Sequence, residues 1–141
     1  MLTLDNAQQI IRAALDDAAS RGLKPLAIVV LDARGALKAA IAQDGAPLLR
    51  DRIAHGKAYG AIGLGMGSRA LFRRAEEQPF FVSAANAIAG GALVPVPGGV
   101  LIRGADGAVL GSVGISGDTS DNDEACAVAA IKAAGLTPDV G

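Results

Sequence analysis

The sequence predicts an α/β (α+β) fold, in which helices cover both faces of a five-stranded antiparallel sheet in the order α-β-β-α-α-β-β-β-α. The first observation behind this prediction is an unbroken apolar run at residues 26–31, typical of a strand that is covered on both faces. The second is the short, glycine-containing connections between neighbouring β-type segments, which can only join antiparallel strands. The third is the helical periodicity of the segments that flank these strands.

Size and composition favour a single domain, residues 1–141, with an aliphatic core. Apolar residues make up 51% of the chain but aromatic residues only 3%, so Val, Ile, Leu and Ala must fill the interior. Small side chains store less hydrophobic energy per residue than aromatic ones, which favours further burial between subunits. No internal repeat or linker indicates a second domain.

Charge and hydropathy argue against nucleic acid and membrane as partners. The chain has 13 Lys and Arg against 14 Asp and Glu, and no basic stripe of the kind that nucleic-acid binding requires. The longest apolar run is far shorter than the ~20 residues that span a bilayer, and the N-terminus lacks a signal-peptide pattern. One cysteine, Cys126, leaves no internal disulfide and no cysteine cluster for a metal. We therefore expect a cytoplasmic protein.

The N-terminal half contains the clearest elements. Thr3 is a suitable N-cap for a helix whose apolar stripe continues to Arg21, and Gly22 suits its C-terminal end. Strands are predicted at 26–31 and 36–42, and helices at about 48–64 and 68–77. Glycines 56 and 60 lie on one face of the middle helix and each costs up to ~1 kcal/mol relative to alanine, so we expect another element to pack very close there.

The C-terminal half is less regular. Residues 79–89 are ambiguous between helix and strand. Strands are predicted at 92–96, 99–103 and 108–115, the last two joined by a hairpin loop. A final helix is expected from about Asp121 to Ala134, with Asp121 and Glu124 as a pair similar to a capping box, and Gly135 and Pro138 end it.

The middle helix carries the first candidate site. Arg52, His55 and Tyr59 share one helical face, where Arg52 could grip an anion and His55 could transfer a proton near neutral pH. The alternative is a solvated helix face. Lys57 points to a different face, where a buried salt bridge and a ligand contact are both open. In a dry pocket its pKa would fall and it could act as a base.

Two loop regions complete the candidate site. Pro97, Gly98 and Gly99 can form a tight turn whose N–H groups converge on a carboxylate or carbonyl oxygen; the alternative is a glycine-rich strand entry. This hypothesis requires the turn to lie in one cavity with the polar face of the middle helix. The acidic residues at 118–124 match no calcium-loop spacing, so we expect no metal site there, and Glu124 or Asp123 facing a pocket instead.

Several short motifs, in a fixed order, resemble one family. They are Val29–Gly35 with Asp44–Ala46, then Gly56–Ala58, then Pro97–Val100, and finally Gly114–Gly117 with Asp123–Ala127. Together they resemble the GlcG/HbpS-like family, which includes the C-terminal domain of PduO-type proteins, over nearly the whole chain. The resemblance implies a profilin-like sheet and a homo-oligomer, often an octamer. It also implies relatives that bind haem, or that lie beside genes for glycolate or propanediol utilisation.

Two functions follow as hypotheses, and whether the protein is an enzyme stays open between them. One is a binding protein for a small organic ligand or haem, with contacts from Arg52, Tyr59, the 97–99 turn and Glu124. For haem, His55 is the only histidine, and Tyr59, Met66, Met1 and Cys126 are the other candidate iron ligands. The other is a cofactor-independent isomerase, tautomerase or lyase for a small carboxylated metabolite, in which His55 or Lys57 moves the proton.

Overall fold

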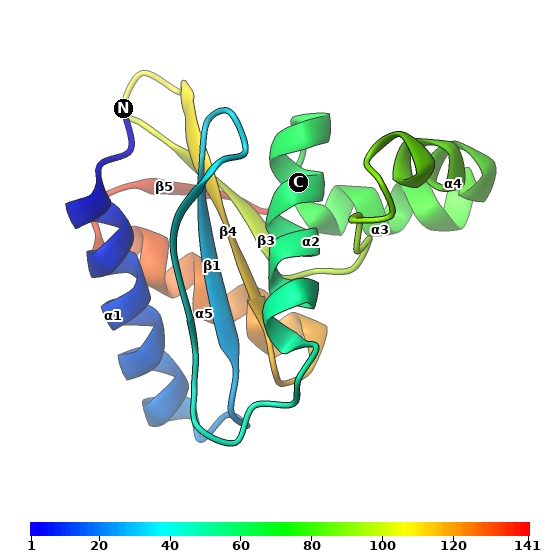
Figure 1. The fold of residues 1–141 in the computed structure, drawn as a ribbon. Coiled ribbons are helices and arrows are strands. Elements are labelled where there is room, and N and C mark those ends of the chain that lie inside the picture. Colours follow the sequence, from blue (N-terminus) through cyan, green and yellow to red (C-terminus); the bar gives the residue numbers. More distant parts are fainter.

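The computed structural model describes residues 1–141 and confirms the predicted fold class, with one antiparallel sheet and helices on both faces (Figure 1). The strands are β1 (Ala27–Asp32), β2 (Leu37–Ala42), β3 (Gly99–Arg103), β4 (Val109–Ser116) and β5 (Thr137–Asp139), in the spatial order β2-β1-β4-β3-β5. The helices are α1 (Leu4–Arg21), α2 (Arg50–Leu64), α3 (Ser68–Glu77), α4 (Pro79–Ile88) and α5 (Ser120–Ala133).

Strand β1 shows why the apolar run at 26–31 does not alternate. Helices α1 and α5 cover one face of the sheet, and α2 covers the other (Figure 1). Because successive side chains of a strand point to opposite faces, Ile28 and Val30 pack in the core beneath α1 and α5. Ala27, Val29 and Leu31 pack beneath α2. Both sets are buried, so every position from Ala27 to Leu31 is apolar.

The first helix begins and ends as the sequence predicts. Thr3 is its N-cap: the hydroxyl accepts a hydrogen bond from the backbone N–H of Asn6, and the Asn6 side chain accepts one from the N–H of Thr3. Gly22 follows the last turn in the left-handed conformation, with φ of 65°. Helix α1 therefore ends at Arg21, and a short connection leads from Gly22 to the start of β1 at Ala27.

The expected close approach at α2 is also confirmed. A Cβ atom built on Gly56 would collide with the carbonyl oxygen of Ala92 and would lie 2.5 Å from a methyl carbon of Val94. One on Gly60 would lie 3.2 Å from the side chain of Leu93. The segment that leaves α4 thus crosses directly over α2, and glycine is what allows it.

The predicted strand at 92–96 is wrong. This segment lies on α2 instead of beside a strand, and its contact with the helix includes a 3.4 Å hydrogen bond from the N–H of Val94 to the carbonyl of Gly56. The fifth strand is β5, which pairs with β3 and places Thr137 opposite Arg103. Pro138 had indicated only the end of a helix, but proline is tolerated in an edge strand such as this one.

The ambiguous residues 79–89 form α4, which packs with α3 as a helical arm (residues 68–88) at one side of the sheet (Figure 1). Among the helices and strands, the backbone of α4 approaches only α3. Val82 is the one buried residue of α4. No helix of the protein has both the length and the apolar character needed to cross a membrane.

Candidate functional site

Arg52 and His55 lie on one cleft with a volume of about 570 Å³, called here the Arg52–His55 cleft. Its apolar floor comes from the sheet, through Val29, Leu37 and Ala40, and residues 90–92 form part of its wall. The cleft therefore combines a guanidinium, an imidazole and the carboxylate of Asp51 with an apolar surface. Such a combination suits a ligand with an apolar body and an anionic group.

Tyr59 extends this polar face of α2 toward a second groove. Its ring stacks on that of His55, with centroids 5.3 Å apart and planes inclined by 19°. Tyr59 also lines an apolar groove of about 390 Å³, shared with Phe81 and Ile88 of α4. The structure thus brings all three predicted residues together on one side of the helix. Stacking restrains the imidazole beside the cleft.

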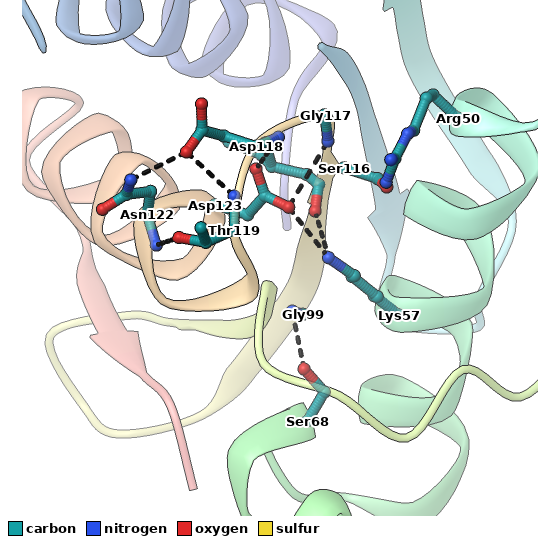
Figure 2. Close-up of polar contacts among 11 residues, drawn as sticks. Arg50, Lys57, Ser68, Gly99, Ser116, Gly117, Asp118, Thr119, Asn122 and Asp123 are labelled. Atoms are coloured by element: carbon teal, nitrogen blue, oxygen red, sulfur yellow. Dashed lines mark hydrogen bonds and ion pairs between the residues drawn. The ribbon is translucent and has the colours of Figure 1, made fainter. Parts of the chain in front are cut away.

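Lys57 lies inside the protein, on the other side of α2 (Figure 2). Two residues along an α-helix correspond to a rotation of about 200°, so Lys57 and His55 point in nearly opposite directions. The Lys57 ammonium donates to the carbonyl of Ile115 at 2.9 Å and to Oδ2 of Asp123 at 3.1 Å. The two charged side chains are only 2% and 1% exposed. Of the alternatives for Lys57, the buried salt bridge is the one present.

The electrostatics of this pair follow from its burial. Burial lowers the pKa of Lys57, and the charge and hydrogen bond of Asp123 oppose that shift. Asp123 accepts two further hydrogen bonds, from the N–H groups of Gly117 at 3.4 Å and Asp118 at 3.0 Å (Figure 2). The pair therefore joins α2, the end of β4 and the start of α5, and it is not part of the Arg52–His55 cleft.

The 97–99 turn lies against Lys57, and not in the cleft with His55. The N–H of Gly99 donates to Ser68 Oγ at 2.7 Å (Figure 2), and the carbonyl of Gly98 accepts from the N–H of Ile115 at 2.9 Å. Gly98 has φ of 121°, and a Cβ there would lie 2.8 Å from the Lys57 ammonium nitrogen. The expectation of one shared cavity is corrected, because the turn and the polar face contact opposite sides of α2.

Glu124 is held by α3. Its carboxylate accepts from Arg69 Nε at 2.9 Å and 3.1 Å, and its side chain is 14% exposed. Arg69 also pairs with Asp121, and these two carboxylates raise the pKa of the guanidinium above its usual value. Pro97 is buried with the turn that it begins. Glu124 and the turn therefore pack near the base of the helical arm, apart from the cleft.

The remaining acidic residues shape the start of α5. Thr119, and not Asp121, is the N-cap, and its hydroxyl accepts from the N–H of Asn122. Asp118 accepts from the N–H of Lys24, from the Asn122 side chain and from the N–H of Thr119, and these bonds lower its pKa to about 2. The acidic side chains at 118, 121, 123 and 124 thus all have partners within the chain, and Asp121 and Glu124 share Arg69.

Sequence reasoning missed the floor and wall of the cleft. Leu37 and Ala40 belong to the edge strand β2, and Gly90 and Gly91 follow α4 as a loop. Their only sequence signals are strand and turn patterns, which carry no information about a cleft. The loop at 90–92 reaches Arg52 only because the segment after α4 crosses back over α2.

Comparisons with solved structures support the fold over almost the whole chain. The PduOC–haem complex is 26% identical with a TM-score of 0.85, and 96% of each chain is covered. The protein ORFY of Klebsiella pneumoniae is 25% identical with a TM-score of 0.84, covering 94% of this chain and 90% of that one. HbpS is 26% identical with a TM-score of 0.79, covering 94% and 89%.

The sequence comparisons point the same way. No curated protein matches the chain. The family described as haem degrading protein HbpS-like matches residues 2–132, which include every strand except β5 and nearly all of α5. The chain therefore belongs to the HbpS-like family.

Proposed function

We propose that the protein binds a small amphipathic ligand in the Arg52–His55 cleft, with haem as the leading candidate. One observation carries this proposal: a guanidinium and an imidazole line the same apolar cleft. An arginine binds carboxylates well because its planar fork matches their two oxygens. The apolar floor would hold the body of the ligand while Arg52 holds its acidic group.

The donor set of the cleft fits a haem. His55 is a side chain of the type that ligates haem iron, its ring is partly exposed, and Tyr59 stacks against it. Arg52 would pair with a propionate, and the sheet residues of the floor would contact the porphyrin edge. A bound haem would supply iron redox chemistry, and these residues would hold and orient it. Similarity to a chain solved as a haem complex supports the proposal.

We propose a cytoplasmic homo-oligomer, up to the octamer that the family resemblance implies, with an accessory role in the catabolism of small acids. The aliphatic, aromatic-poor composition supports burial between subunits.

Titration with haemin tests the binding proposal. Wild-type protein is expected to give a shifted Soret band with saturable binding, and His55→Ala is expected to lose the shift. Arg52→Ala is expected to weaken binding about tenfold, equivalent to about 1.4 kcal/mol. Arg73→Ala, an exposed arginine of α3 outside the cleft, is the matched control and should bind as the wild type does. An unchanged Soret band and affinity in His55→Ala would overturn the assignment of this cleft.

A second candidate function is proton transfer on a small carboxylated metabolite. The observation that favours this function is that Arg52 and His55 line the same cleft. Arg52 would hold the carboxylate of the metabolite, and His55 would accept or deliver a proton at the adjacent carbon. Lys57 would act as a positioning residue here, because its ammonium is committed to Ile115 and Asp123. Deuterium wash-in from D₂O into a panel of 2-keto acids, followed by NMR, should stop in His55→Ala. Wash-in at the wild-type rate in that variant would eliminate this function.

A further inference from the structure

We propose that the outer face of α4, formed by Phe80, Ala84, Ala87 and Ile88, is an interface that packs against the same face of a second copy of this chain. The inference rests on the proposed assembly, for which it names the surface, and it is independent of the ligand. The helical arm lies to one side of the sheet, with α4 outermost (Figure 1).

The outer face of α4 is apolar and exposed. Phe80 is 75% exposed and Ile88 is 89% exposed, and Ala84 and Ala87 between them are exposed as well. These four positions follow the i, i+4, i+7, i+8 spacing of one helical face. No residue of α4 is charged. A helix with no charged residue and few polar ones is expected to bury most of its surface, yet only Val82 of α4 is buried within this chain.

The exposed apolar area is what the core of an interface needs. Phe80 and Ile88 alone present on the order of 300 Å², since a large apolar side chain covers about 150–250 Å². A standard interface buries about 800 Å² per partner, of which a little more than half is apolar. The outer face of α4 therefore supplies more than half of the apolar area that one partner of a standard interface buries.

The charges around this face favour a second copy over other occupants. Helix α3, which packs with α4, carries Arg73 and Arg74 beside Glu76 and Glu77, so the arm carries charges of both signs. A two-fold contact presents identical surfaces to each other, and a rim that carries both signs can pair with itself. Arg74 already lies over the ring of Phe81, 5.0 Å from its centroid. Helices that lie on membranes instead carry Lys and Arg along their polar face, which α4 lacks.

The test compares the solution mass of wild-type protein with that of the double variant Phe80→Glu/Ile88→Glu. Both side chains are exposed, so the fold is expected to persist, with unchanged circular dichroism. Leu48→Glu is the matched control, because Leu48 is 86% exposed and lies outside the arm. Masses are measured by light scattering after size exclusion, at several concentrations. Haemin binding is measured on the same samples, and sedimentation with vesicles of anionic lipid serves as a separate arm.

We expect the wild-type protein to be an assembly. The solution mass of the double variant should be at least twofold lower than that of the wild type, and the mass of the control should equal that of the wild type. A loss of haemin binding with intact mass bears on the proposed ligand alone, so the two measurements separate the ligand from the interface. A wild-type monomer at 100 µM would overturn both the proposed assembly and this interface. An assembly of unchanged mass in the double variant, an equal loss in Leu48→Glu, or a wild-type monomer that sediments with vesicles would each overturn the interface.

Discussion

Replacing Lys57 by methionine removes one member of a buried ion pair while keeping most of the aliphatic stem in place. The carboxylate of Asp123 would then stay 1% exposed with no opposite charge beside it. Only the N–H groups of Gly117 and Asp118 would still donate to it, at 3.4 Å and 3.0 Å. We expect this variant to be much less stable than the wild type.

The magnitude follows from the burial of the pair. Breaking a fully buried ion pair on one side costs about 3–5 kcal/mol, because an uncompensated charge remains in the interior. The free energy of unfolding of a domain is about 5–15 kcal/mol, so this loss is a large share of the total stability. It corresponds to a decrease of about 10–15 °C in the melting temperature. Asp123→Asn alone leaves the ammonium unpaired and is expected to cost a similar amount.

The double variant Lys57→Met/Asp123→Asn removes both charges and should recover at least about 2 kcal/mol relative to the sum of the two single losses. Urea unfolding at pH 7 measures all four free energies, and their double-mutant cycle gives the coupling. A cost below about 1 kcal/mol for Lys57→Met, or additive single effects, would refute the assignment of a strong buried pair.

The pH dependence gives an independent signature of the same pair. Because the pKa of Lys57 is lowered in the folded state, the unfolded chain holds more protons between that pKa and the ordinary value of 10.5. Stability from this group therefore rises with pH across that window. The free energy of unfolding is measured against pH for the wild type and for Lys57→Met, and the difference between the two curves isolates the contribution of Lys57. A difference that declines across the window would contradict the direction of the shift.

Three further predictions concern other sites. Gly63→Ala, where a Cβ meets nothing within 4 Å, should stabilise the protein by about 0.5–1 kcal/mol, whereas Gly56→Ala in the same helix should destabilise it. Thermal melts compare the two, and equal effects would refute the close approach at Gly56. The pKa of Asp118 is lowered from 3.8 to about 2. The stability that this carboxylate contributes is therefore present above pH 4 and is lost as the pH falls toward 2. The acid unfolding of Asp118→Asn, followed by circular dichroism, should lack this part of the transition. Burial raises the pKa of the Cys126 thiol to about 12, so labelling by a thiol reagent at pH 8 should require unfolding, and rapid labelling of the native protein would contradict this.

Local patterns predicted most of the fold because they report which faces are buried. The apolar run at 26–31 identified β1 as an interior strand, and it does pair with both β2 and β4. The glycines of α2 predicted a close neighbour. The same patterns failed at 92–96 and at β5, because an extended segment lying on a helix and one lying beside a strand have similar composition.

The candidate site could be predicted only in part. Helical spacing placed Arg52, His55 and Tyr59 on one face, and the structure has them together. Spacing also separated Lys57 from that face, but it could not identify Asp123 as the partner, which lies 66 positions further along the chain. The position of the 97–99 turn depended on that same distant packing.

The properties that depend on near neighbours can be read from the amino-acid order alone: the caps, the helical faces, the buried strands and the turns. Which of those faces meet depends on the packing of the whole chain. It placed residues 90–92 beside His55, buried Lys57 against Asp123, and left the outer face of α4 exposed. The physical reason is that such contacts join segments tens of residues apart, and their energies arise only when packing removes both partners from water.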